Sequence, residues 1–381
     1  MPPISRRLFA SSLSYAVGAA IAPRAAHSAT PRMAGHPPGA SDVPRPVIDL
    51  SSNENPYGPS PAALEAMTGT QAVACRYPDE VERRVVEAIA AHHATAPDRI
   101  VLGCGSSEVL RLCDAAFLGP GRTVVAAQPT FEAVLHYAKV TRAEAVTLPL
   151  TADFRHDLAA MARACDSRTG LVYVCNPNNP TGTIVRGDAL ASFLERVPRT
   201  AVVVVDEAYH HFVEDPGYRS AASLVERFPN LIVTRTFSKI YGMAGMRLGY
   251  ALASAANAEA LRVQAAWSNV NVAVAAAALA CLADPELPAR QRALLNGTRE
   301  ALCQALEKQG RRYIPSETNF LMIDVGGDVN PLIPAFEARG IKVGRRFAAM
   351  PQWLRVTIGR PEETESFFRA LGELVKLRAA A

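Results

Sequence analysis

From residue 99 onward, short apolar runs alternate with stretches in which apolar residues recur at helical spacing. Four such pairs follow one another: 99–103 and 106–117, 123–127 and 131–140, 170–174 and 188–197, and 201–206 and 221–228. This alternation is typical of parallel strands connected by helices. Runs as continuous as 201–205 and 231–233 suit strands that are covered on both faces. The pattern predicts an α/β fold whose large domain has a mostly parallel sheet with helices on both faces.

The C-terminal third has a different pattern. It predicts a long helical region over 272–309, a strand at 320–325, a helix, short strands at 341–343 and 354–358, and a last helix. We therefore expect a smaller C-terminal α/β domain over 272–381 beside a large domain over 71–271. Residues 47–70 are expected to form an N-terminal arm that contributes to the small domain.

The N-terminus has the pattern of a twin-arginine export signal. Arg6 and Arg7 precede a weakly apolar stretch at 8–22, and small residues follow at 26–29. We expect a signal over 1–29, a Pro-rich linker over 30–46 and a periplasmic or exported protein, with a cytoplasmic location as the alternative. The apolar stretch is shorter than the roughly 20 residues of a membrane span, and no span is expected in the mature chain.

Composition narrows the function classes. Forty basic and 36 acidic residues give a formal charge of +4, without the concentrated positive field that nucleic acid binding needs. The seven cysteines are widely spaced, and neither a CxxC pair nor an HExxH frame is present. We expect neither a nucleic acid partner nor a metal site.

A lysine stands in a polar, glycine-flanked loop directly after the predicted strand at 231–233. Lys239 in such a loop can form an imine with an aldehyde cofactor. The hydroxyls of Thr236 and Ser238 and the guanidinium of Arg247 suit a phosphate dianion. Taken alone, the segment also fits an ordinary basic surface loop.

A carboxylate ends the run 201–206. If Asp206 is buried there, it needs a cationic partner, and a protonated pyridine nitrogen would serve. Tyr209, three residues later, could then hydrogen-bond a phenolic oxygen on the same ring. The alternative is that Asp206 only caps a helix.

Two further junctions could hold the same ligand. Asn179, in the turn from Asn176 to Gly182, can donate to a ring oxygen, although such residues also favour plain turns. The backbone N–H groups of Ser106 and Ser107 lie at the start of a predicted helix, where they could bind a phosphate group. Alternatively, this segment is only a glycine-rich connector with a serine that caps the helix. Phe131 could stack on a flat ring or pack in the core.

These segments, in this order, resemble the class I/II aminotransferases that use pyridoxal 5'-phosphate, a fold-type I family. The sequence is most similar to the histidinol-phosphate aminotransferase branch. The segments typical of that branch are 52–58 (SNENPYG), 76–79 (RYPD), 176–182 (NPNNPTG) and 354–359 (LRVTIG).

The resemblance implies a role for each residue. Lys239 would carry the cofactor as a Schiff base and shuttle a proton between the substrate α-carbon and the cofactor, while Asp206 would pair with the pyridine nitrogen. Tyr209 and Asn179 would bind the ring oxygen. The residues that would hold the phosphate are Ser106, Ser107, Thr236, Ser238 and Arg247.

The resemblance also implies substrate and subunit contacts. Arg355 would bind the substrate carboxylate, and Tyr57 would line the pocket for the side chain of the substrate. Tyr77 would reach the cofactor phosphate of a neighbouring subunit, which implies a homodimer with shared active sites. From the residues themselves, Arg345 and Arg346 could add positive charge near the far end of the substrate or form a solvated basic loop.

We therefore expect an aminotransferase that acts on histidinol phosphate, an aromatic or another amino acid, together with a 2-oxo acid. A decarboxylase of the threonine-phosphate type would use the same lysine, aspartate and arginines and is the alternative. A non-enzymatic exported protein of the same fold would be expected to have lost at least one of these residues.

Overall fold

The computed structural model describes residues 48–375. The predicted export signal at 1–29 and the predicted linker at 30–46 lie outside the described residues.

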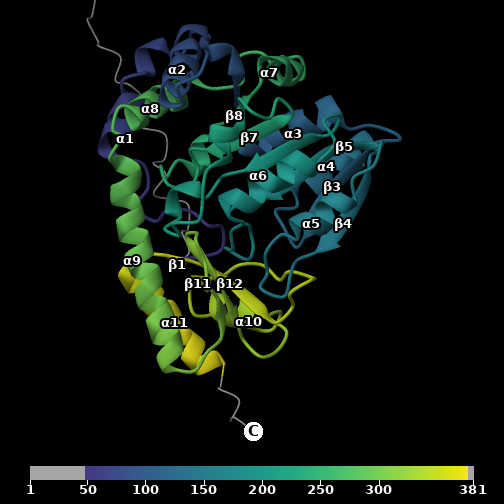
Figure 1. Cartoon of the computed structure of the whole chain (residues 1–381). Helices are drawn as coiled ribbons and strands as arrows, with labels where there is room; N and C mark the ends of the chain where they lie inside the picture. The colour runs from purple at the N-terminus through teal and green to yellow at the C-terminus, as the bar shows by residue number, and fades with distance from the viewer. Residues whose placement is uncertain (1–47, 376–381) are drawn as a thin grey trace, which may run out of the picture. The chain divides into compact units, whose positions relative to one another are not determined.

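Seven strands form the central sheet of the described chain, in the order β2-β8-β7-β6-β5-β3-β4 (Figure 1). The strands are β2 (Ile100–Gly103), β3 (Thr123–Gln128), β4 (Glu144–Pro149), β5 (Thr169–Cys175), β6 (Val202–Asp206), β7 (Leu231–Thr236) and β8 (Gly249–Ala253). Strand β8 runs antiparallel to β2 and β7, and the other neighbouring pairs are parallel. The predicted α/β fold with a mostly parallel sheet is confirmed.

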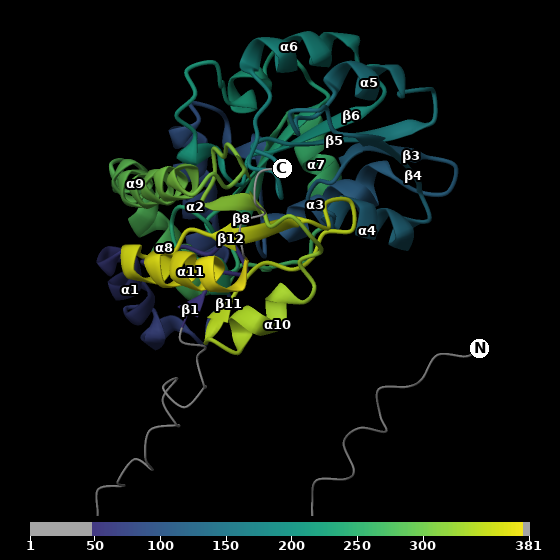
Figure 2. The same ribbon diagram turned by 90° about the horizontal axis from the view of Figure 1, so that it is seen from below.

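Helices cover both faces of this sheet. One face carries α3 (Ser106–Phe117), α4 (Ala133–Thr141) and α7 (Ala255–Arg262), and the other carries α2 (Asp79–His92), α5 (Leu158–Arg163) and α6 (Gly187–Arg196). In Figure 2, α5 and α6 lie above the strands, whereas α3 and α4 lie below them. Successive side chains of β6 point to opposite faces, so Val203 packs in one core cluster and Val204 in the other.

One predicted helix of the large domain is wrong. Residues 221–228 form only a short 3-10 turn, Ala221–Leu224. The Glu207 carboxylate accepts from the Ala221 backbone N–H at 2.6 Å, which fixes the start of this segment, and the 3-10 turn ends at Leu224, seven residues before β7 begins at Leu231. The apolar pattern also missed β4 and β8, because β4 is a largely exposed edge strand and β8 is rich in glycine and alanine.

The helical region predicted over 272–309 is two helices. Helices α8 (Val272–Leu282) and α9 (Leu287–Lys308) meet at 87°. Pro285 lies in the break and Pro288 in the first turn of α9, and a proline removes a helical hydrogen bond. Within residues 48–375, no single helix has the length and apolar character of a membrane span; α8 and α9 pass that test only as a bent pair.

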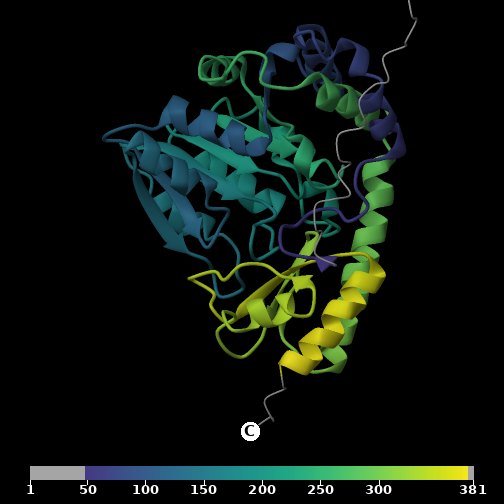
Figure 3. The same ribbon diagram turned by 180° about the vertical axis from the view of Figure 1, so that it is seen from behind.

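The C-terminal region forms an antiparallel sheet in the order β12-β10-β9, which confirms the predicted strands at 320–325 and 354–358. These strands are β9 (Tyr313–Ile314), β10 (Phe320–Asp324) and β12 (Trp353–Thr357), accompanied by helices α10 (Leu332–Glu337) and α11 (Pro361–Leu374). Figure 3 shows α11 beside α9.

The start of the described chain joins this region. Strand β1 (Ile48–Asp49) pairs in parallel with β11 (Ile341–Lys342), whereas helix α1 (Pro61–Thr68) packs against α8. The segment between β1 and α1 therefore crosses from the C-terminal sheet toward the helices beside the large sheet. The predicted domain boundaries at 70 and 271 stay predictions.

Candidate active site

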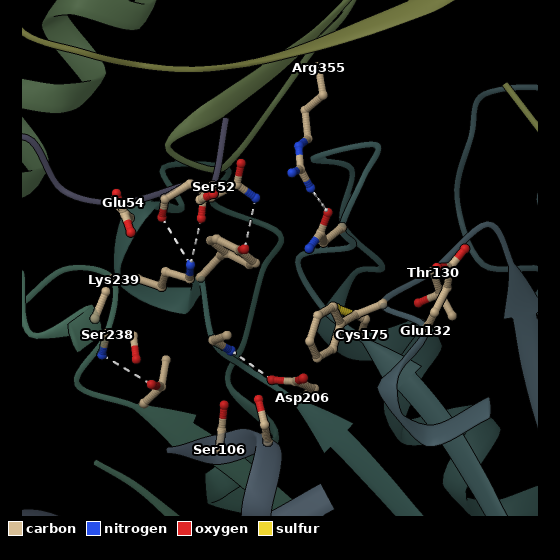
Figure 4. A pocket seen from close by; sticks show the side chains of 18 of the residues that line it. Ser52, Glu54, Ser106, Thr130, Glu132, Cys175, Asp206, Ser238, Lys239 and Arg355 are labelled. Carbon is tan, nitrogen blue, oxygen red and sulfur yellow. Dashed lines mark hydrogen bonds between the residues drawn. The ribbon is translucent and has the colours of Figure 1, made fainter. Parts of the chain in front are cut away.

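A cavity of about 440 Å³ lies at the carboxyl ends of β5, β6 and β7 and the N-terminal end of α3, where parallel strands place ligands. The fold brings eleven of the predicted residues together on its wall: Ser106, Ser107, Phe131, Asn179, Asp206, Tyr209, Thr236, Ser238, Lys239, Arg247 and Arg355. In Figure 4, Arg355 and Ser106 lie at opposite ends, with Lys239 and Asp206 between them.

One end of the cavity is built to hold an anion. Helix α3 begins at Ser106, and the backbone N–H groups of Ser106 and Ser107, which have no hydrogen-bond partner among residues 48–375, lie at the cavity. Arg247 Nη1 donates to Ala244 O at 2.9 Å and lies 3.4 Å from Ser238 Oγ, which places the guanidinium beside that turn. Gly105 has a left-handed φ of 78°, and a side chain there would overlap the Arg247 guanidinium.

A buried carboxylate stands at the end of β6. Asp206 is 2% exposed, accepts from Tyr173 Oη at 2.9 Å and from the Ala208 backbone N–H at 3.1 Å. Burial raises the pKa of the Asp206 carboxyl above its usual value. Within residues 48–375 no salt bridge reaches it, so a cation delivered by a ligand would supply the missing partner.

The Lys239 amine points at the segment between β1 and α1. Lys239 Nζ donates to Asn53 O at 3.0 Å and to Ser52 O at 3.3 Å (Figure 4). Burial, followed by the positive charge of Arg355, lowers the pKa of Lys239 to about 8. The lowered pKa increases the neutral fraction of the amine, which is the form that attacks an aldehyde.

A second cation enters the cavity from the C-terminal sheet. Arg355, on β12, is 9% exposed, and its Nη1 and Nη2 donate to Asn179 Oδ1 at 2.8 Å and to Ser51 O at 2.9 Å. Its buried Nε–H has no partner among the described residues. Arg355 lines the cavity, and a guanidinium there suits a carboxylate or phosphate group.

A model of the family described as aminotransferase class I and II matches residues 45–371. The chain belongs to this family. Among its relatives are histidinol-phosphate aminotransferase of Moorella thermoacetica, 39% identical over 86% of each protein, and histidinol-phosphate aminotransferase 2 of Ralstonia nicotianae, 40% identical over 88% of this chain and 91% of that protein. The solved structure of histidinol-phosphate aminotransferase from Sinorhizobium meliloti in complex with pyridoxal 5'-phosphate superposes with a TM-score of 0.81, at 27% identity over 86% of this chain and 90% of that one.

The cofactor of this aminotransferase is pyridoxal 5'-phosphate, and the cavity fits it. The anion site, formed by the start of α3 at Ser106 and by the Arg247 guanidinium, would bind the phosphate. The Asp206 carboxylate would face the protonated pyridine nitrogen, and the Lys239 amine would form an imine with the aldehyde. When bound, the ring supplies an electron sink for the substrate α-carbon. With the cofactor in place, Asp206 would keep the ring nitrogen charged, Arg355 would bind the substrate anion and Lys239 would provide an amine that can move a proton.

Two predicted residues lie away from this cavity in the single chain. Tyr57 packs against the core, with the Arg360 guanidinium 5.5 Å above its ring, and does not line the cavity. Tyr77 is 86% exposed on the surface. The proposed contact of Tyr77 with a neighbouring subunit needs such exposure, whereas the role of Tyr57 stays a prediction.

Tyr173 and Asn53 belong to the aminotransferase site but carried no predicted role, whereas Arg345 and Arg346 had two open interpretations. Tyr173, two residues before the end of β5, donates to Asp206, and the strand period of two was the only available signal. Asn53 lay inside the segment 52–58 that marks the resemblance, but no role was assigned to it. Arg345 lines the cavity, and its Nη2 lies 2.6 Å from Glu132 Oε2, whereas Arg346 pairs with Asp328.

Proposed function

We propose that this aminotransferase uses histidinol phosphate as amino donor and a 2-oxo acid as acceptor. The proposal is supported by the names of the relatives and by one feature of the site, the nearly buried Arg355 guanidinium with an unpartnered Nε–H. A single guanidinium can bind the phosphate of the donor and then the carboxylate of the acceptor, because both groups present two anionic oxygens that accept two hydrogen bonds. An aromatic or other amino acid remains the competing donor class.

The half-reaction tests this proposal. Purified protein with bound cofactor is mixed with histidinol phosphate, phenylalanine, tyrosine or glutamate without any 2-oxo acid, while absorbance is recorded from the near-ultraviolet to the violet. Conversion of the cofactor to its amine form fastest with histidinol phosphate supports the proposal. Faster conversion with an aromatic amino acid overturns the donor. Release of carbon dioxide from threonine phosphate, added in a parallel sample, without conversion of the cofactor favours the decarboxylase.

We also propose that the active form is a homodimer in which Tyr77 reaches the partner's cofactor phosphate. The described surface carries two highly exposed aromatic side chains, Tyr77 at 86% and Trp267 at 97% exposure. Ser268 Oγ donates to Asp79 Oδ1 at 3.2 Å, so the segment with Trp267 lies beside the start of α2, next to Tyr77. Large exposed aromatic side chains at neighbouring positions favour an interface.

Subunit mixing tests the shared site. Lys239→Ala and Tyr77→Ala are each expected to be nearly inactive alone. If sites are shared, mixed dimers regain activity, because one of their two sites combines the intact lysine with the partner's intact tyrosine. No recovery in mixed dimers, or a monomer by light scattering, contradicts the proposal.

We further propose export of the folded enzyme by the twin-arginine route. Arg6 and Arg7 precede the region that matches the family, which begins at residue 45. Replacing both arginines with lysine should retain the protein in the cytoplasm of a host with this pathway, whereas the unchanged chain reaches the periplasm. Equal distribution of both chains overturns the export proposal.

A further inference from the structure

Asn53 occupies an unusual position between the two regions of the described chain. It is 1% exposed and has a left-handed φ of 56°, a conformation that asparagine tolerates better than most residues. Its backbone N–H donates to Thr357 Oγ1 at 2.8 Å, and its carbonyl accepts from Lys239 Nζ and, at 3.1 Å, from Asn319 Nδ2. Asn53 therefore links the lysine loop to β12 and to the start of β10.

The orientation of the Asn53 amide follows from the neighbouring hydroxyl. Thr357 Oγ1 already accepts from the Asn53 backbone N–H, so its own proton needs a separate acceptor. Asn53 Oδ1 lies 3.4 Å away and fills that role. The amide nitrogen consequently faces the other side, where Asn53 Nδ2 donates to Tyr209 Oη at 3.0 Å.

This contact determines what Tyr209 can do. An amide NH₂ group only donates, so the phenol oxygen must accept, and the phenol proton is left to point elsewhere. Tyr209 is 4% exposed and lines the cavity, and the described residues offer this proton no acceptor. Burial raises the pKa of Tyr209, which keeps the phenol protonated at neutral pH.

We propose that Asn53 is a positioning residue that fixes Tyr209 as a hydrogen-bond donor toward the ring oxygen of the cofactor. Asn53 does this through the Tyr209 phenol, without contacting the reacting atoms itself. The proposal rests on the family's cofactor and on the predicted contact of Tyr209 with the ring. It is independent of which amino donor the enzyme uses.

A donated hydrogen bond stabilises negative charge on the ring oxygen and weakens the attraction of that oxygen for the neighbouring imine proton. The imine pKa is therefore lowered while the Tyr209 proton points at the ring. Asn53→Asp replaces the amide donor with an acceptor, so Tyr209 would donate to the new carboxylate instead. We expect the imine pKa to rise by about one pH unit or more, because a hydrogen bond is lost and a negative charge is gained.

The test is a pH titration of the absorbance band of the cofactor linked to Lys239, with no amino donor present. The titration is repeated on a double-mutant cycle of wild type, Asn53→Asp, Tyr209→Phe and the double variant. The cycle separates the effect of the new negative charge on the imine pKa from the effect of the changed hydrogen bond between residues 53 and 209. Asn55→Asp is the matched control, since Asn55 lies in the same segment and contacts Ile240 O instead of Tyr209. The expected result is a shift in Asn53→Asp that shrinks by at least half in the Tyr209→Phe background.

Two outcomes overturn the proposal: an Asn53→Asp titration that coincides with wild type, or an equal shift with and without the Tyr209 hydroxyl. If Asn53→Asp does not fold, Asn53→Gly serves, because glycine accepts the left-handed φ and removes only the amide. It should shift the titration in the same direction by a smaller amount, and no shift would again reject Asn53. Because no donor substrate is added, a wrong histidinol phosphate assignment would leave this titration unaffected.

Discussion

Arg355 Nη1 donates to the side-chain oxygen of Asn179 at 2.8 Å, so the predicted anion clamp and the predicted ring-binding amide are in direct contact. The bond orients both groups. With Oδ1 occupied by the guanidinium, the amide nitrogen of Asn179 is the group left for the cofactor ring oxygen. The predicted substrate clamp is therefore held by a residue that also lines the cavity.

Asn179→Asp should weaken substrate binding more than Asn179→Ala. The introduced carboxylate would pair with Arg355 and compete with the substrate anion, and the KM for the 2-oxo acid should rise about tenfold or more, equivalent to about 1.4 kcal/mol. Steady-state kinetics of both variants provide the measurement. An equal KM in the two variants would show that the added charge does not reach Arg355.

Lys239→Ala should remove the imine absorbance band and lower the turnover rate by roughly a thousandfold or more, while the protein stays folded. Absorbance and circular dichroism on the same sample separate the two effects. Lys139→Ala, an exposed lysine on α4, is the control and should keep the band. Retention of the band in Lys239→Ala would reject Lys239 as the cofactor-linked lysine.

Gly105→Ala should weaken cofactor binding. Position 105 has a φ of 78°, and a methyl group there would overlap the Arg247 guanidinium at the anion site. We expect the dissociation constant of the cofactor to rise about 10- to 100-fold, equivalent to about 1.4 to 2.7 kcal/mol. Titration of the protein freed of cofactor measures this change.

The matched control is Gly119→Ala, because nothing lies within 4 Å of a side chain at that position and its φ is not left-handed. Its cofactor affinity should equal that of the wild type. If Gly105→Ala binds the cofactor as tightly as wild type does, anion binding at this site does not depend on the close approach of the Arg247 guanidinium to residue 105.

Asp114→Asn should stabilise the protein at high pH. Burial raises the pKa of Asp114 on α3 to about 6, and its Oδ1 has no hydrogen-bond partner in the described chain. The folded state therefore binds the proton more tightly than the unfolded state, whose pKa is near 3.9, and stability is lost as the pH rises from about 4 through 6. After allowance for solvent screening, the variant should gain about 1 to 2 kcal/mol at pH 8.

Chemical denaturation at pH 8 and at pH 4 measures this gain. The difference between variant and wild type should shrink to a small fraction of this gain at pH 4, where Asp114 is protonated in the folded state and about half protonated in the unfolded state. A gain that is the same at both pH values would mean that the substitution acts through packing and not through the charge.

The sequence pattern predicted the strands that carry the chemistry better than the elements around them. Strands β5, β6 and β7 are buried on both faces, and their continuous apolar runs are a local signal. The edge strand β4 and the glycine-rich β8 have no such run, and the two prolines that divide α8 from α9 lay inside an otherwise helical pattern. Elements with weak local signals are formed by their tertiary neighbours.

The sequence by itself determined the class of fold, the cofactor family and most residues of the site, because each motif is local: a strand ends and the next few residues face the ligand. Only the tertiary structure decided how these motifs act on one another. Asn53 and Thr357 are 304 residues apart in the chain, yet their hydrogen bond sets which way the Asn53 amide points and where the Tyr209 proton can go. Hydrogen-bond direction depends on every partner around a group, and those partners are assembled only when the distant segments pack together.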